Sequence, residues 1–573
     1  MTAIAADPFV RAASLAELRE AGRLVVHVEG NTLCLFADGD SLHAVDNRCP
    51  HMGFPLHRGT VADGILTCHW HHARFDLCSG GTFDQFADDV RVFPVEVRGD
   101  DVYVDPRPRV DAVAHQRRRL RDGLERNISL VLAKAAIALD AAEPDGTDVL
   151  QTGIEFGVER RGSGWGRGLT TLTCFANLVP RLDRADRPAA LYHGVADVAA
   201  ESAGESPRFP LDPLPAGGAE PRRVAGWVRR FVEVRDAEGA ERAVVSAVRA
   251  GATPAELADM LFAAATDHRY LESGHALDFV NKALEALDLV GWDAAEAVLG
   301  SLAPVLADAQ RMEETNAWRN PVDLVALLDA AFDELGSLEL GSGGFVGRAE
   351  LVETLLGDDP AAGVDAVLAA LREGAAVVEV ASAVSFAATT RIARFPTSNE
   401  FGDWDTALHT FTFANAVEQG LRRSSSRELV RGIFDSAMSI YLDRFLNVPA
   451  ARLPRPDGAA DPDALLAELP GLLDRQQQVD EAGTLAASYL AAGGAADRLI
   501  AALGAALVRE DRNFHTIQCV EAAARQHELT GDGLPLIAAA RYLAAHATTS
   551  RSQRQTFEIA RRLHRGERLY EEI

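Results

Sequence analysis

Two short runs near the start of the chain carry the residue types that bind metals. Positions 49–51 read C-P-H and positions 68–71 read C-H-W-H, with sixteen residues between the His of the first run and the Cys of the second. Cysteine thiolates and neutral imidazoles are both metal ligands. The spacing therefore predicts one metal centre with two sulfur and two nitrogen ligands, supplied by Cys49, His51, Cys68 and His71.

The pattern C-x-H, sixteen residues, C-x-x-H resembles the signature of the Rieske family. That family holds a [2Fe–2S] cluster with two Cys on one iron and two His on the other. Two longer segments also resemble the cluster loops of bacterial Rieske ferredoxins and Rieske-type oxygenases. They are N-R-C-P-H-M-G at 47–53 and C-H-W-H-H-A-R-F-D at 68–76. A zinc site is the alternative. Short zinc modules place both Cys in one knuckle and both His in another, whereas here each run supplies one of each.

The resemblance covers roughly residues 10–108 and implies a cluster at the tip of a small domain, with partly exposed His ligands. Rieske proteins of quinol-oxidising complexes carry a Ser two residues, and a Tyr four residues, after the last His ligand, and these hydroxyls raise the potential. Ala73 and Phe75 stand there instead, and Phe54 replaces a Cys of their extra disulfide. We expect a potential near the bottom of the Rieske range of roughly −150 to +300 mV.

The residues around the two runs have the alternation of β-strands. The pattern predicts strands over 24–28, 32–37, 91–97 and 101–104, and Gly99-Asp100 between the last two predicts a hairpin. We therefore expect a small all-β Rieske domain over residues 1–108.

The composition limits the partners and the compartment. The chain has 573 residues and a net charge of −27, which argues against a nucleic-acid surface because phosphate binding requires basic patches. Its six cysteines have no spacing typical of a disulfide framework. No signal peptide is visible, and the most apolar stretch, 374–390, is short and contains Glu379. We expect a cytoplasmic protein without a membrane anchor.

From the proline-containing stretch 105–109 onward, the pattern becomes that of helices. Ala and Leu dominate, and apolar residues recur at spacings of three and four. We expect a large all-α region over 109–573 with at least fifteen helices, in one core or two subdomains. The clearest helical patterns run over 254–264, 276–289, 321–335, 351–371 with a break, 407–421, 480–491 and 537–547.

Several histidines of the helical region are candidate metal ligands. On a continuous helix, His268, Glu272 and His275 would lie at i, i+4 and i+7 on one face. The spacing Glu-x-x-His is also that of di-iron carboxylate proteins, although no second copy is found. The iron motif of ring-hydroxylating Rieske oxygenases is absent, because Asp267-His268 followed by His275 has the wrong gaps.

Two further pairs place Asp and His four residues apart: Asp405 with His409, and Asp511 with His515. Such a pair can supply two ligands, or a His oriented by a carboxylate. The alternative for each residue is an ordinary core or surface histidine, and we expect His115, His527, His546 and His564 to be surface residues. Other candidates are His193, in an apolar run, Glu313, Glu314 and Asn316, and the loop 399–404, which suits a pocket or a helix cap.

These residues support two functional hypotheses. In the first, an NAD(P)H-dependent ferredoxin reductase or a ferredoxin reduces the cluster, which passes single electrons to a non-haem iron oxygenase site in the helical region. There His193, His409 and His515 are the candidate catalytic residues for a reaction of dioxygen with a small-molecule substrate. In the alternative, the chain is a Rieske ferredoxin whose acidic helical region docks a partner enzyme. A redox sensor is a third idea that no residue favours.

Overall fold

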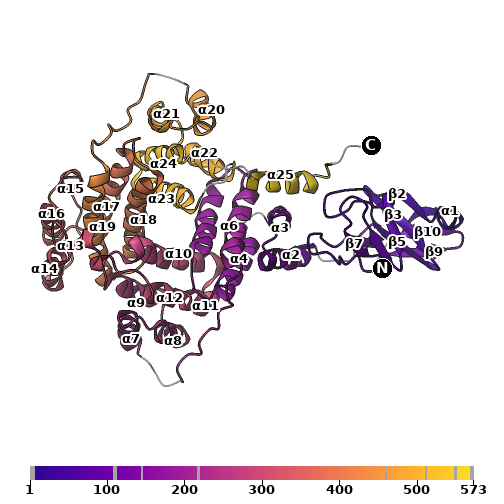
Figure 1. The fold of residues 1–573 in the computed structure, drawn as a ribbon, viewed down its shortest axis with the longest axis horizontal. Helices are drawn as coiled ribbons and strands as arrows, with labels where there is room; N and C mark the ends of the chain where they lie inside the picture. The colour runs from indigo at the N-terminus through magenta and orange to yellow at the C-terminus, as the bar shows by residue number, and fades with distance from the viewer. Residues whose placement is uncertain are drawn as a thin grey trace, which may run out of the picture. The chain divides into compact units, whose positions relative to one another are not determined.

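The chain forms two compact units. One comprises residues 1–149 and 553–573, and the other comprises residues 150–552 (Figure 1). The computed structural model describes residues 7–107, 112–143, 146–215, 220–458, 461–509, 513–547, 552–567 and 569.

The first unit contains the named strands of the described chain, in three antiparallel sheets. The sheets have the orders β1-β10-β9, β2-β3-β4-β8 and β5-β6-β7. The strands are β1 (Val10–Ser14), β2 (Arg23–Val28), β3 (Asn31–Asp38), β4 (Ser41–Asp46), β5 (Thr60–Ala62), β6 (Ile65–Thr67), β7 (Arg74–Asp76), β8 (Val92–Phe93), β9 (Val95–Arg98) and β10 (Asp101–Val104).

The sequence pattern predicts most of these strands. Strands β2 and β3 pair with Leu24 opposite Leu35, and Arg98 pairs with Asp101 across the predicted hairpin. The expected strand over 91–97 is instead two strands, β8 and β9, in different sheets. Pro94 lies between them and has no N–H to donate to a ladder, which explains the interruption.

Helices α2 (Ala112–Arg126), α3 (Ser129–Ala142) and α25 (Ser552–His564) accompany the strands in the first unit, together with the short α1 (Leu15–Ala21). Arg119 of α2 makes an ion pair with Asp88 and donates to the Ala87 carbonyl at 3.0 Å. Arg48 donates to the Glu567 carbonyl at 3.0 Å, just beyond α25. These bonds join α2 to the segment between β7 and β8, and the residues after α25 to the loop that carries Cys49 and His51.

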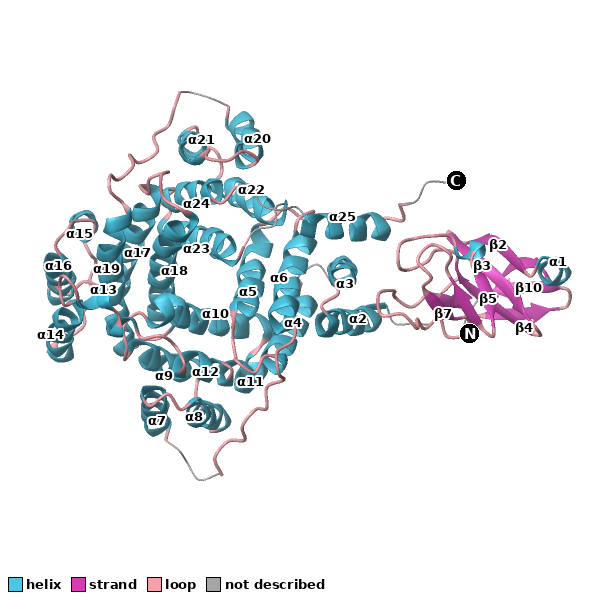
Figure 2. Cartoon of the chain, in the orientation of Figure 1, coloured by secondary structure: helices cyan, strands magenta, loops and turns pink. Residues whose placement is uncertain are grey.

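The second unit is helical throughout its named elements, and α4 (Thr147–Arg160) crosses the division (Figure 2). Its helices include α5 (Arg167–Leu178), α6 (Arg187–Ser202), α7 (Pro221–Glu233), α8 (Ala237–Arg249), α9 (Pro254–Thr266), α10 (His275–Val290), α11 (Ala295–Gly300), α12 (Leu302–Ala307), α13 (Asn316–Arg319), α14 (Leu324–Ser337), α15 (Arg348–Leu355), α16 (Pro360–Arg372), α17 (Val377–Ala393), α18 (Phe401–Arg423), α19 (Arg431–Asp443), α20 (Pro462–Leu473), α21 (Val479–Ala491), α22 (Ala496–Arg509), α23 (Phe514–Thr530) and α24 (Leu534–Ala545).

The predicted fold class, a small β domain followed by a large helical region, is confirmed. The helical patterns correspond to α9, α10, α14, α15 with α16, α18, α21 and α24. Helix α9 begins with a capping box between Thr253 and Glu256. Among the described residues, no helix is both long and apolar enough to cross a membrane.

One helical expectation is wrong. Helix α9 ends at Thr266, and His268 and Glu272 lie before α10 rather than on one helix with His275. Glu272 has a φ of +50°, in the left-handed region, and Gly274 has a φ of +92°. The chain therefore turns here, and the three side chains do not share a helical face.

Candidate functional site

The first metal-binding loop follows β4 and is closed by its own backbone. The Cys49 N–H donates to the Phe54 carbonyl at 2.8 Å, and the Gly53 N–H donates to the Cys49 carbonyl at 2.8 Å. Gly53 has a φ of +81°, and a Cβ there would lie 3.2 Å from the Arg48 side chain and 3.3 Å from Leu563. Glycine thus allows the tight turn that shapes this loop.

The second loop connects β6 to β7 and approaches the first. The Cys68 N–H donates to the Ala73 carbonyl at 2.8 Å. The rings of His51 and His71 have centroids 4.9 Å apart, and the buried thiols of Cys49 and Cys68 hydrogen-bond to each other. His51 is half-buried and His71 is exposed. The two loops therefore bring the four predicted ligands together.

The two thiols of this site differ in acidity. The hydrogen bond with Cys68, followed by burial, raises the pKa of the Cys49 thiol well above its usual value, so this thiol has to lose its proton when a metal binds. The bond with Cys49 and the backbone N–H groups of Trp70 and His71 lower the pKa of the Cys68 thiol, against the effect of burial. Burial and the nearby Lys134 lower the pKa of His51 to about 4, so that its imidazole is neutral. His51 Nδ1 is buried without a hydrogen-bond partner. This donor set suits a [2Fe–2S] cluster with two thiolate and two imidazole ligands.

The surroundings of the two loops are mostly apolar. Ala73 and Phe75 are both fully buried in the core that also contains the two cysteines, and neither side chain carries a hydroxyl. Trp70 lies against His71, with ring centroids 4.4 Å apart, and Phe86 lies 4.9 Å from His51. These side chains limit the access of water to the sulfur ligands.

Lys134 of α3 is a contact that the sequence pattern does not reveal. Its Nζ donates to the carbonyls of Pro50 at 2.6 Å and His51 at 2.7 Å, and lies 4.0 Å from Asp88. Burial lowers the pKa of this lysine, while Asp88 raises it. The contact joins residues more than eighty positions apart, so that local spacing could not indicate it.

A second group of ligand-type residues lies in the helical unit. His275, at the start of α10, His409 of α18 and His515 of α23 each offer a nitrogen, and these atoms lie within 4.8 Å of one another. The Nε2 atoms of His409 and His515 are 3.0 Å apart. His275 Nδ1 is buried without a hydrogen-bond partner. We call His275, His409 and His515 the three-histidine site.

The environment keeps the imidazoles of His275 and His409 neutral. Burial, followed by the neighbouring His409 and His515, lowers the pKa of His275 to about 2. Burial and His515 likewise lower the pKa of His409 to about 4. Only a neutral imidazole has a lone pair for a metal, so no proton has to leave these two rings before a metal binds.

Asp405 lies behind the three-histidine site rather than in it. Its carboxylate is 3.3 Å from Nδ1 of His515 and 3.2 Å from Nε2 of His546, and it accepts a hydrogen bond from Tyr542. Burial raises the pKa of Asp405, but these three bonds lower it well below its usual range. A carboxylate on the outer nitrogen of a metal-binding His fixes the tautomer and the orientation of the ring. His546 is buried, so its assignment to the surface is wrong.

The other candidate ligands lie outside the three-histidine site. His268 binds Glu313 through Nδ1 at 2.7 Å, and exposed Glu272 accepts from the Gln310 N–H at 2.8 Å. His193 is buried on α6, beside Tyr192, with ring centroids 5.2 Å apart. Glu314 lies in the short 3-10 turn before α13, and Asn316 is the first residue of α13. Asp511 falls outside the described residues.

The segment 399–404 serves both expected purposes. Glu400 and Asp403 form a capping box at the start of α18. The same segment lines a pocket of about 500 Å³, together with Gln476 and Val479. Phe401 stacks on His546 with centroids 5.3 Å apart, so the pocket adjoins the network around Asp405.

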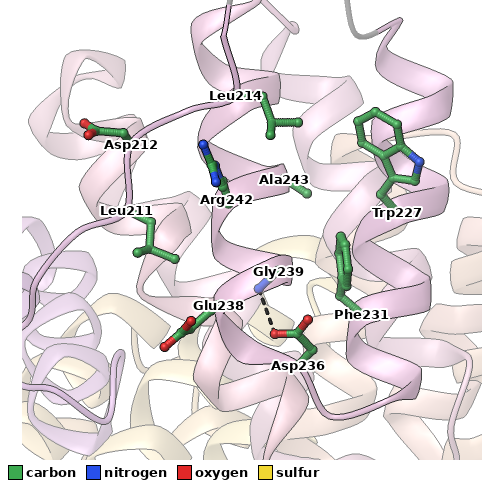
Figure 3. A pocket seen from close by; sticks show the side chains of 10 residues that line it. All are labelled: Leu211, Asp212, Leu214, Trp227, Phe231, Asp236, Glu238, Gly239, Arg242 and Ala243. Carbon is green, nitrogen blue, oxygen red and sulfur yellow. Dashed lines mark hydrogen bonds between the residues drawn. The ribbon is translucent and has the colours of Figure 1, made fainter.

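Another pocket, of about 700 Å³, lies between α7 and α8 and contains none of the candidate ligands (Figure 3). Trp227 and Phe231 line one wall, and Arg242 lines another. Asp236, at its base, caps α8 by accepting from the Gly239 N–H at 2.9 Å. Its acidic side chains therefore have a structural role as well as exposure to the pocket.

Comparisons with known proteins concern the N-terminal part of the chain. The ferredoxin component of the naphthalene 1,2-dioxygenase system of Pseudomonas aeruginosa is 29% identical over 100 residues, which cover 17% of this chain and 96% of that protein. Human apoptosis-inducing factor 3 is 35% identical over 71 residues, 12% of each chain. The solved ferredoxin of carbazole 1,9a-dioxygenase from Nocardioides aromaticivorans is 29% identical, covering 17% of this chain and 98% of that one with a TM-score of 0.17.

The family model of the Rieske [2Fe-2S] domain matches residues 9–94. No family model matches the C-terminal helical region. The match includes both metal-binding loops and all four of their ligand-type side chains. The N-terminal part of this chain therefore belongs to the Rieske [2Fe–2S] family.

Proposed function

We propose that the chain is an iron-dependent oxygenase, in which the Rieske domain relays single electrons to a metal bound at the three-histidine site. The observation that carries this proposal is the convergence of three imidazoles from α10, α18 and α23 to within 4.8 Å, in the same chain as an electron-transfer domain. An electron-transfer domain requires an electron acceptor. A metal at the three-histidine site would be an acceptor in the same chain, which would explain why the two domains are joined.

Different side chains of this protein would hold the two metal centres. Cys49, Cys68, His51 and His71 would hold the [2Fe–2S] cluster, which supplies one-electron chemistry when bound. The three-histidine site would bind a metal ion, and Asp405 would orient His515 toward it. An external NAD(P)H-dependent ferredoxin reductase, or a ferredoxin, is the proposed electron donor.

The choice of iron rests on ligand chemistry and on the attached domain. Imidazole suits zinc, copper, iron and nickel alike. Three histidines also bind catalytic zinc in some enzymes, but zinc has no redox chemistry and cannot accept electrons from a cluster. Three protein ligands leave coordination positions open for dioxygen and a small-molecule substrate. A redox-active metal therefore fits the chain better than zinc.

Metal analysis of the full chain is the decisive experiment. We expect about three irons per chain in loaded protein, two in the cluster and one in the helical unit. His275→Gln, His409→Gln and His515→Gln should each remove only the third iron. His268→Gln and His193→Gln are matched controls, because these residues lie outside the site, and should keep it. Loaded wild-type protein with only the cluster irons would refute the proposal.

The second candidate function is an electron carrier whose helical unit docks a partner enzyme. It is favoured by the ferredoxin component that aligns along 96% of its own length. The net charge of −27 suits a basic partner. In this case the three-histidine variants would change neither the iron content nor the rate at which the chain reduces its partner.

A further inference from the structure

A set of polar side chains, most of them buried, lies between α5, α10 and α23 in the helical unit. Helix α5 packs against both α10 and α23, and side-chain hydrogen bonds connect α10 to α23. Apolar residues fill most of this interior, so a polar set of this size needs an explanation. We call it the buried polar path. Its buried members are Asp278, Asn281, Lys282 and Glu285 of α10, and Gln518 and Glu521 of α23, and half-buried Asn177 of α5 joins them.

Hydrogen bonds connect most of its members. Lys282 Nζ donates to Glu521 at 2.7 Å and to Glu285 at 2.9 Å. Asn177 donates to the same two carboxylates, at 2.7 Å to Glu285 and 2.9 Å to Glu521. Gln518 donates to Asp278 at 2.6 Å. Asp278 lies one helical turn from Lys282 on α10, which makes it the link between the two halves.

The path reaches the three-histidine site at one end. Asp278 lies three residues after His275 on α10, and Gln518 lies three residues after His515 on α23. Residues three apart are neighbours on a helix surface. The bonded pair of Asp278 and Gln518 therefore lies one turn from two of the three histidines.

The path reaches solvent at the other end. Asn177 and Glu521 also line a surface pocket of about 190 Å³, together with Arg181, Arg525 and Glu528. Glu521 thus bonds to buried Lys282 on one side and borders the pocket on the other. A proton that enters from this pocket meets Glu521 and Lys282 first, and Asp278 lies one helical turn further along α10.

The path contains acceptors that the protein leaves unpaired. Gln518 Oε1 and Asn281 Oδ1 are buried without a hydrogen-bond partner, and their residues are 2% and 1% exposed. An unpaired buried acceptor destabilises the folded protein, so a network selected for stability alone would not retain two of them. Such atoms are suited to binding water between Asp278 and Lys282.

The charges of the path favour a bound proton. Glu285 and Glu521 both pair with the Lys282 ammonium, and the charge of Arg525 on α23 also acts on both carboxylates. Burial, together with Glu521 and Glu285, raises the pKa of Asp278 to about 7, while Lys282 and Gln518 oppose the increase. The Cys174 thiol of α5 also faces these groups, and burial raises its pKa well above its usual value. Asp278 is therefore the acid that can gain or lose a proton near neutral pH.

We propose that the buried polar path conducts protons from the pocket beside Arg181 to the three-histidine site, with Asp278 as the last acid. This inference rests on the proposed oxygenase function. The overall reaction, RH + O₂ + 2e⁻ + 2H⁺ → ROH + H₂O, consumes two electrons from an external reductase and two protons from solvent. One oxygen atom enters the substrate, the other becomes water, and each electron needs an accompanying proton.

The first experiment measures proton-coupled oxidation without a substrate. Iron-loaded full chain is reduced with dithionite, freed of excess reductant and mixed with oxygenated buffer. Each reduced chain carries two electrons, one on the cluster and one on the iron of the three-histidine site. With two protons these electrons reduce one dioxygen to hydrogen peroxide. We expect Asp278→Asn and Glu521→Gln to slow reoxidation at least tenfold, with Asp278→Glu restoring much of the rate. In wild-type protein the rate should fall above pH 7 as Asp278 loses its proton. The matched control is Asp443→Asn, because Asp443 of α19 is equally buried, its pKa is also raised to about 7, and it lies outside the path.

The second readout needs no turnover. The infrared difference between metal-free wild-type protein and Asp278→Asn should contain a protonated carboxylic acid band that disappears with a midpoint near pH 7. Absence of this band, or a wild-type reoxidation rate and pH profile in Asp278→Asn with normal iron content, would overturn the path alone. If wild-type protein binds no iron beyond the cluster, the proposed function fails and the path fails with it. The iron content therefore separates the two failures.

Discussion

At the scale of single residues, the Rieske site is defined as much by a missing hydroxyl as by its four ligands. Phe75 is fully buried in the core that contains Cys49 and Cys68, and Ala73 beside it is equally buried. Neither can donate a hydrogen bond to sulfur. Because such bonds stabilise the reduced, more negative cluster, their absence favours a low potential.

Phe75→Tyr should therefore raise the midpoint potential of the [2Fe–2S] cluster. A hydrogen bond to a charged group is worth about 1.5 kcal/mol, which corresponds to roughly 60 mV for one electron. A redox titration that follows the magnetic resonance of the reduced cluster measures the change. Phe93→Tyr is the matched control, because it adds the same hydroxyl to the other core of this unit. Equal potentials in wild type and Phe75→Tyr would contradict this account of the cluster environment.

The neutral imidazoles of the three-histidine site predict a pH-dependent stability for metal-free protein. In the unfolded chain an imidazole binds a proton below about pH 6.5, whereas folded His409, with a pKa of about 4, does not. The unfolded state therefore binds more protons in this window, and the free energy of unfolding falls as the pH falls. For His409 the loss amounts to roughly 3 kcal/mol between pH 7 and pH 4.

Urea denaturation of the helical unit at pH 7 and pH 5 tests this expectation. His409→Gln should show a flatter dependence than wild type, since the substituted side chain does not titrate. His527→Gln, a partly exposed His of α23, should leave the dependence unchanged. A wild-type midpoint that is constant or increases toward pH 5 would contradict the burial of neutral imidazoles.

The sequence predicts a site well when its ligand residues lie close together in the chain, and poorly when they lie far apart. The Rieske ligands lie in two runs only sixteen residues apart, and their spacing alone predicts their convergence. His275, His409 and His515 lie on three helices, and no spacing rule relates them. The sequence indicated these histidines as candidates, but it placed His268, Glu272 and His193 beside them with equal weight. Only the packing of α10, α18 and α23 separates the two groups.

At the scale of elements, periodicity predicts where helices and strands lie, but it does not predict how they end. The patterns over 407–421 and 480–491 correspond closely to α18 and α21. The prediction of a helix between α9 and α10 is wrong because three non-glycine residues there adopt positive φ. Tyr270, Glu272 and Ser273 have φ values of about 50°, and only Gly274 beside them is a glycine. Their conformation is maintained by tertiary contacts, such as the bond from the Glu272 N–H to the Gln310 carbonyl at 2.8 Å.

Helix α3 acts on the cluster loop through one side chain. Lys134→Met should lower the midpoint potential, by an amount on the order of tens of millivolts. The substitution removes a positive charge that stabilises the reduced state, and it leaves Arg119 to compensate the carboxylate of Asp88 without the lysine. It also removes the two bonds to the carbonyls of Pro50 and His51.

A redox titration measures this effect, and Arg126→Met is its control because Arg126 is an exposed cation at the end of neighbouring α2. The control should leave the potential unchanged. A potential that increases in Lys134→Met would show that the lysine stabilises the oxidised state, contrary to the expected sign.

At the scale of the whole molecule, the chain separates its two candidate centres into different units. The cluster ligands lie in the unit of residues 1–149 and 553–573, and the three-histidine site lies in the unit of residues 150–552. Each unit has its own buried core, so each has its own stability. A metal bound at one centre should therefore stabilise the unit that contains it.

This separation predicts selective stabilisation by metal. Adding Fe(II) anaerobically to protein that retains its cluster but lacks the third metal should raise the melting temperature of the helical unit only. At a free concentration of one hundred times the Kd, the stabilisation is about 2.7 kcal/mol, a shift of a few degrees. Differential scanning calorimetry measures it, and the absorption of the cluster assigns the other transition. In His409→Gln the added metal should have no effect. If iron instead raised the melting temperature of the cluster-containing unit, the second metal site would lie outside the helical unit. The assignment of the two metal centres to different units would then be wrong.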